Sequence, residues 1–95
     1  MTELDVMCRR TADGDDWTCD VAIDVEGGPS TRHVVAVTAD DLERLDPGAR
    51  DPHRLVDASF RFLLAREPAT SILRTFDLME IGRYFPEFET AIRDA

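Results

Sequence analysis

The stretch from Leu55 to Leu64 constrains the fold more than any other part of the chain. Its apolar residues recur at the three- and four-residue spacing of a helix, and they form a stripe wider than about 100°. Asp51 can cap the start of such a helix, Pro52 suits its first position because the missing N–H needs no partner there, and Pro68 ends it. We therefore predict a helix that is buried over most of its surface. Its core residues are predicted to be Phe60, Leu63 and Leu64.

Two stretches near the N-terminus, residues 4–8 and 17–25, alternate apolar and polar residues as half-buried strands do. Asp13-Gly14 lies between them and is typical of a tight hairpin turn, because both residue types tolerate positive φ angles. The apolar residues have even numbers in the first stretch and odd numbers in the second, so the apolar faces coincide only where the numbers of two paired residues add up to an odd number. A two-residue turn at 13 and 14 pairs residues whose numbers add up to 27. The predicted pairs are Leu4 with Ile23, Val6 with Val21, Cys8 with Cys19, and Arg10 with Trp17.

The next part of the chain predicts a turn, a strand and a short helix. The turn is Gly27 to Ser30, and the strand runs from His33 to Thr38 with apolar residues on both faces, which leaves its register open. Thr38 is a typical helix N-cap residue. The buried residues of that helix are predicted to be Leu42 and Leu45, and Asp46-Pro47-Gly48 ends it.

The stretch from Thr70 to Phe76 allows two interpretations. Its hydroxyl residues can cap a short helix, which we favour, whereas its β-branched residues would also suit a strand. Asp77 and Glu80 have the spacing of a capping box and predict a helix to about Tyr84. A last turn or short helix follows from Phe85-Pro86-Glu87, with Phe88 and Ile92 facing inward.

The predicted fold class is α+β, in a single domain that spans residues 1–95. Residues 1–38 form a three-stranded antiparallel β-meander, and residues 39–95 add four to five helices packed on one of its faces. All five phenylalanines and the only tyrosine lie between residues 60 and 88, so the core is expected there. The predicted buried face joins Leu4, Val6, Trp17, Cys19, Val21 and Ile23 of the sheet to Phe60, Leu63, Leu64, Phe76 and Tyr84.

The formal net charge of −9 is the strongest compositional feature. Residues 1–50 carry 12 acids and 5 arginines, whereas residues 51–95 carry 8 acids and 6 arginines. Such a charge repels nucleic-acid phosphates and anionic membranes, so neither is expected as a partner. Every basic residue except the two histidines is arginine. A GC-rich genome and adaptation to salt are both open as explanations of this composition.

The compartment is predicted to be the cytoplasm. The first residues are acidic and lack the basic and apolar regions of a signal peptide, and no apolar run approaches the ~18 residues of a membrane span. Cys8 and Cys19 face each other at a predicted hydrogen-bonded pair, where Cα atoms lie about 5.5 Å apart. A disulfide could form at that distance. Because the cytoplasm keeps thiols reduced, we expect two small buried thiols instead.

The sequence contains no clear catalytic or metal-binding motif. His33 and His53 lack ligand spacing to a cysteine, and neither Ser59 nor Ser71 stands in a nucleophile elbow. No catalytic residue, cofactor or metal is therefore predicted, and an enzyme is the less favoured class. Two alternatives stay open: a small enzyme or ligand-binding domain whose pocket joins His33 or His53 to nearby acids, and a nucleic-acid binder with a helix–turn–helix over Thr70 to Tyr84.

A further pattern occupies the C-terminal part of the chain. It consists of Phe60-Arg61-Phe62-Leu63-Leu64, Arg66-Glu67-Pro68, Ser71-Ile72-Leu73, Phe76-Asp77-Leu78 and Tyr84-Phe85-Pro86-Glu87-Phe88. This pattern resembles a family of small bacterial proteins of uncharacterised function. The resemblance implies a shared fold, and it implies no catalytic residue, cofactor or substrate.

The function favoured by these features is a small cytoplasmic interaction or accessory module that binds a protein partner or its own copy. The C-terminal half is nearly neutral and carries apolar residues suited to an interface, whereas the outer face of the hairpin is strongly acidic. The predicted interface, including that of a homodimer, is Met79, Phe85 and Phe88, with Arg74 or Arg83 at its polar rim. An alternative stays open, in which these three apolar side chains close the core of the monomer instead.

Overall fold

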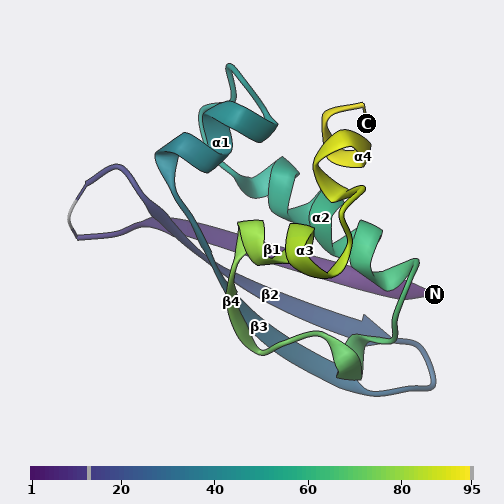
Figure 1. Ribbon diagram of the computed structural model, residues 1–95. Coiled ribbons are helices and arrows are strands. Elements are labelled where there is room, and N and C mark those ends of the chain that lie inside the picture. Colours follow the sequence, from purple (N-terminus) through teal and green to yellow (C-terminus); the bar gives the residue numbers. More distant parts are fainter. Residues whose placement is uncertain (13, 95) are drawn as a thin grey trace.

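Three antiparallel strands begin the fold of the computed structural model, which describes residues 1–12 and 14–94. Strand β1 (Thr2–Arg10) pairs with β2 (Trp17–Val25), and β2 pairs with β3 (Ser30–Val37). The predicted hairpin register is confirmed at all four pairs from Leu4–Ile23 to Arg10–Trp17. Figure 1 shows the helices gathered on one side of this sheet, as expected of the α+β class.

The last hydrogen-bonded pair before the turn of the hairpin is Thr11 with Asp16, whereas a two-residue turn at 13 and 14 would be closed by residues 12 and 15. The amide of Thr11 donates to the carbonyl of Asp16 (2.9 Å), and the amide of Gly14 donates to the carbonyl of Thr11 (3.1 Å). Asp13, the other predicted turn residue, lies outside the described residues. Because hydrogen-bonded and non-hydrogen-bonded pairs alternate along an antiparallel ladder, Cys8 and Cys19 fall at a non-hydrogen-bonded pair.

Cys8 and Cys19 form a disulfide, so the prediction of two free thiols is wrong. Their Cα atoms are 4.0 Å apart, which agrees with the closer type of antiparallel pair. The predicted spacing of about 5.5 Å failed because it assumed the wrong closing residue, although the register itself was right.

A fourth strand, β4 (Thr75–Asp77), corrects the prediction of a three-stranded sheet. It lies parallel to β3 at the edge of the sheet, with Val35 opposite Phe76. The favoured helix over Thr70 to Phe76 is therefore wrong: a 3₁₀ helix, η1 (Ala69–Ser71), precedes an extended segment. Phe76 is buried from this strand, and the amide of Val34 donates to the carbonyl of Arg74 (2.7 Å).

The first helix, α1 (Ala39–Leu45), begins as predicted at Thr38. The amide of Asp41 donates to the Thr38 hydroxyl (3.0 Å), and the amide of Thr38 donates to the Asp41 carboxylate (3.2 Å), which completes a capping box. Leu42 and Leu45 are buried, as predicted.

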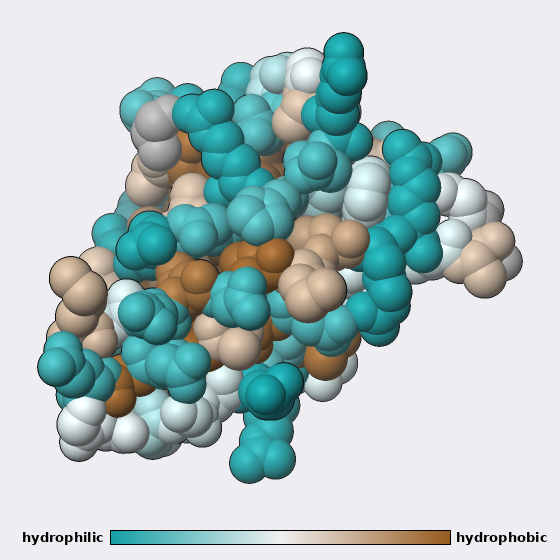
Figure 2. Space-filling view, turned by 180° about the vertical axis from the view of Figure 1, so that it is seen from behind, coloured by the Kyte–Doolittle hydropathy of each residue, from teal (hydrophilic) through white to brown (hydrophobic). Residues whose placement is uncertain are grey.

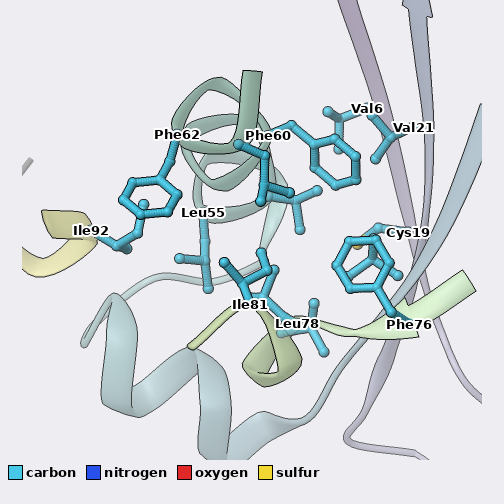
Figure 3. Close-up of a cluster of buried hydrophobic side chains, with 14 of the residues drawn as sticks. Val6, Cys19, Val21, Leu55, Phe60, Phe62, Phe76, Leu78, Ile81 and Ile92 are labelled. Atoms are coloured by element: carbon cyan, nitrogen blue, oxygen red, sulfur yellow. The ribbon is translucent and has the colours of Figure 1, made fainter. Parts of the chain in front are cut away.

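The central helix, α2 (His53–Leu64), is buried on two sides. In Figure 3, Phe60 points toward Val6 and Val21 of the sheet, whereas Phe62 points away from them toward Ile92. The Phe62 ring meets the Phe88 ring edge-on at 5.2 Å. These two contacts explain why the apolar stripe in the sequence is unusually wide. Phe60 and Leu63 are buried as predicted, and Leu64 is half-buried against the core.

Three short helices complete the chain: η2 (Leu78–Glu80), α3 (Ile81–Tyr84) and α4 (Phe88–Arg93). The predicted capping box at Asp77 and Glu80 is confirmed. Phe88 and Ile92 are buried as predicted. Tyr84, however, was predicted to be core and is 69 % exposed.

The buried face of the sheet largely follows the prediction. Val6, Cys19, Val21 and Ile23 are buried, whereas Leu4 and Trp17 are half-buried against the core. Figure 2, a view from behind Figure 1, shows hydrophilic side chains over much of that side of the molecule, around a hydrophobic area near its centre. No helix within the described residues is long and apolar enough to cross a membrane.

Candidate functional site

His33 is a structural residue in this fold. Its side chain is only 3 % exposed, and both ring nitrogens have partners: Nδ1 lies 2.7 Å from the Leu73 carbonyl, and Nε2 lies 2.9 Å from the Thr31 hydroxyl. Because a carbonyl can only accept, we assign the Nδ1 proton to the bond with Leu73. The ring also packs 5.5 Å from that of Phe60. His33 thus fastens the segment before β4 to the sheet.

The two histidines are not brought together with acids in a pocket. No carboxylate binds the ring of His33, and His53 is exposed in the first turn of α2. Within residues 1–12 and 14–94, no group of three histidine, cysteine or acidic side chains could hold a metal ion. Among the described residues, the ring of His33 is thus held by Leu73 and Thr31, and His53 lies at the surface.

The segment from Thr70 to Tyr84 does not form a helix–turn–helix. It contains the end of η1, the strand β4, η2 and the four-residue helix α3. A recognition helix needs enough turns to lie in the major groove of DNA, and α3 has only about one turn. The helix–turn–helix considered for this segment is therefore not formed.

An open groove of about 390 Å³ lies where the end of α2, the segment before β4, and α3 meet. Its floor is apolar and comes from separate parts of the sequence: Leu63 on α2, Phe76 on β4 and Ile81 on α3. All three side chains are buried, so the floor is part of the hydrophobic core. Figure 3 shows Phe76 and Ile81 within the cluster of buried side chains, on two segments of the C-terminal part of the chain. Hereafter this site is the α2–α3 groove.

The rim of the α2–α3 groove carries exposed apolar side chains. Leu73 is 50 % exposed and Tyr84 is 69 % exposed. Among the described residues, the only other large apolar side chains that are strongly exposed are those of Met7, on β1, and Met1, which precedes β1. Phe85 also lines the groove, where it is half-buried and meets Phe62 edge-on at 5.8 Å. The groove is therefore continuous with an exposed apolar surface.

Two carboxylates, those of Glu67 and Glu80, also line the α2–α3 groove, and no basic side chain does. Glu80 is held in place because its Oε2 accepts from the Asp77 amide at 3.0 Å. None of the six ion pairs among the described residues uses either carboxylate. The groove thus combines an apolar floor with uncompensated negative charge.

The structure separates the five residues predicted as an interface. Phe88 is fully buried under Phe62, so its placement on a surface was wrong, and Met79 is half-buried against the core. Phe85 alone lines the α2–α3 groove. Arg74 and Arg83 are exposed and outside it. Arg74 instead lies with Arg32 beside a hollow of about 370 Å³ at the start of β3.

Leu73, Tyr84 and Glu67 were not predicted as candidate site residues. Leu73 offered one signal, because it is a large apolar residue next to Ile72 in an extended segment where only one of the two can face the core. Glu67 offered none, since its proximity to Glu80 depends on how α2 and α3 pack.

Comparison with protein-family models, with curated proteins and with solved structures finds no match for this chain. The resemblance of its C-terminal part to a family of small bacterial proteins stays a prediction. What is established is the fold class, an α+β domain with a four-stranded mixed sheet.

Proposed function

We propose that this protein is an interaction module that binds a segment of a partner protein in the α2–α3 groove. The observation that carries this proposal is the continuity of the apolar floor with the exposed side chains of Leu73 and Tyr84. Covering apolar surface gains about 25 cal/mol per Å² removed from water, so such a surface favours a bound partner. A groove of this size accommodates side chains of an inserted segment.

A partner protein fits this surface better than a second copy of the chain does. A symmetric homodimer through the groove would bring Glu67 and Glu80 of both copies into one interface, and neither groove contributes a basic side chain to balance them. Each copy also carries a net charge of −9, and like charges across an interface cost several kcal/mol. The predicted homodimer is therefore the competing outcome of the experiment.

The proposal is tested by selecting short random peptides on the immobilised protein and measuring their binding to three purified forms. These are the unchanged chain, Leu73→Ser in the groove rim, and Met7→Ser as a control. Met7 is a matched choice because it is 68 % exposed and lies on β1. We expect the selected peptides to bind the unchanged chain and Met7→Ser equally, and Leu73→Ser about tenfold more weakly.

Two results would overturn the proposal. The first is a selection that yields no binding peptide or only peptides bound equally well by Leu73→Ser. The second is a dimer in sedimentation of the unchanged chain that dissociates in Leu73→Ser, because the groove would then be occupied by a second copy. Thermal unfolding of both variants confirms that each is folded before binding is compared.

A further inference from the structure

We infer that the segment bound in the α2–α3 groove carries a bulky apolar side chain beside an arginine or lysine. This inference rests on the proposed function and specifies the chemistry of the partner. Its basis is the juxtaposition, in one groove, of an apolar floor with Glu67 and Glu80.

The two carboxylates enter the groove from different elements. Glu67 follows α2, where its amide donates to the Leu63 carbonyl at 2.9 Å, and its side chain is half-buried. Glu80 ends η2 and is also half-buried. Since the Asp77 amide holds one oxygen of Glu80, this carboxylate is preorganised and still has acceptor capacity. A cation on a bound segment would meet Glu80 in the position where it is already held.

The chain's own arginines leave these carboxylates available. Arg66 is the arginine closest in sequence to Glu67, but it pairs with Glu87 at 3.3 Å and lies over the Phe62 ring at 3.6 Å. Arg83 is exposed and does not line the groove. The negative charge of the groove is thus matched by a partner or by solvent ions.

Partial burial strengthens the attraction that a cation would feel. A charge-assisted hydrogen bond from an ammonium or guanidinium group is about twice as strong as a neutral one, and it strengthens as water is excluded. Tyr84 and Phe85 also line the groove, and a guanidinium group can stack on aromatic rings. An acidic segment would instead be repelled by both carboxylates and by the net charge of −9.

The test uses a focused peptide library in which an apolar residue is fixed and its neighbours are arginine, lysine, serine or glutamate in equal proportion. Selection is carried out on the unchanged chain, on Glu67→Arg and on Glu43→Arg. Glu43 is a matched control because it is an exposed acid on α1 outside the groove, and its replacement changes the net charge equally.

We expect arginine and lysine to be enriched on the unchanged chain and on Glu43→Arg, and this enrichment to be lost or replaced by glutamate on Glu67→Arg. Binding of the basic peptides should also weaken as salt is added, because salt screens the attraction. Matching thermal unfolding of the two variants shows that the fold is preserved.

Three outcomes separate this inference from the proposed function. If the selected peptides bind Leu73→Ser more weakly than the unchanged chain but are not enriched in arginine or lysine, the inference is wrong and the proposed docking in the groove still holds. Basic enrichment that is equal on all three forms also overturns it, because the attraction then comes from the overall charge. Failure of every peptide to distinguish Leu73→Ser overturns both.

Discussion

Phe60 lies at the centre of the hydrophobic core, and its replacement tests that core most directly. Its ring is fully buried and packs 5.9 Å from that of Phe76. We expect Phe60→Ala to lower the free energy of unfolding by about 3–5 kcal/mol, since it loses transfer energy and leaves a cavity. Urea titration followed by circular dichroism measures this difference.

Tyr84→Ala is the matched aromatic control. Because the Tyr84 side chain is 69 % exposed, its removal should change the free energy of unfolding by less than about 0.5 kcal/mol. Equal losses for the two variants would contradict the assignment of Phe60 to the core and Tyr84 to the surface.

The contrast between these aromatics shows what periodicity can predict at single residues. Phe60 and Leu63 were placed correctly because α2 is 12 residues long. In a helix of that length, the spacing of the apolar residues shows which residues face the core. Tyr84 lies in a helix of only four residues. In so short a helix the buried side depends on tertiary packing, which the local sequence does not encode.

Among the elements, the β1–β2 hairpin offers a prediction about redox state. The disulfide joins residues 11 positions apart, Cys19 is fully buried, and Cys8 is half-buried. We expect reduction by excess dithiothreitol to lower the free energy of unfolding by about 2–3 kcal/mol, the usual effect of opening a short covalent loop. Urea titration with and without the thiol measures it.

Cys8→Ser provides the control, because its stability should not respond to the thiol. An unchanged chain that is equally stable in both conditions would contradict a stabilising disulfide. The cytoplasm is reducing and would open this disulfide. If the protein is located there, as the sequence predicts, it would lose the stability that the disulfide contributes.

The ion pair of Arg44 and Glu89 links α1 to α4 and predicts a dependence of stability on pH. The hydrogen bond from Arg44 lowers the pKa of the Glu89 carboxyl below its ordinary value of 4.5. A pKa that is lower in the folded chain stabilises the fold above the ordinary value, and that contribution is lost as the pH falls through the lowered pKa. Glu89→Gln should therefore unfold more easily than the unchanged chain near neutral pH, and the difference should vanish in acid.

Thermal unfolding across the acid range measures this difference. Glu43→Gln, which removes an exposed acid from α1, is the control and should show no comparable pH-dependent loss. A difference between Glu89→Gln and the unchanged chain that persists unaltered in strong acid would show that it does not come from the charge of Glu89.

At the scale of elements, local rules predicted most of the sheet and failed at its edge. The alternating pattern and the turn gave the right register for β1 and β2, because a shift by one residue would turn every apolar side chain to solvent. Strand β4 was missed because it has three residues and depends on pairing with β3, far away in the sequence. For the same reason the α2–α3 groove, whose lining comes from α2, β4 and α3, could not be predicted.

For the whole molecule, the net charge of −9 outweighs the few places where arginines gather. The hollow beside Arg32 and Arg74 offers two exposed arginines and no carboxylate in its lining. Phosphate contacts supply nearly all non-specific affinity for DNA, and two arginines neutralise too few phosphates to overcome the repulsion of the remaining surface.

We therefore expect no binding of duplex DNA or single-stranded RNA at physiological salt in fluorescence anisotropy, even at high micromolar protein. Lowering the salt should not reveal tight binding, because the repulsion then acts over a longer distance. The double variant Arg32→Ser with Arg74→Ser serves as the control, and it should behave like the unchanged chain. Micromolar binding that weakens steeply with added salt and is lost in this variant would contradict the expectation and make the hollow a phosphate-binding site.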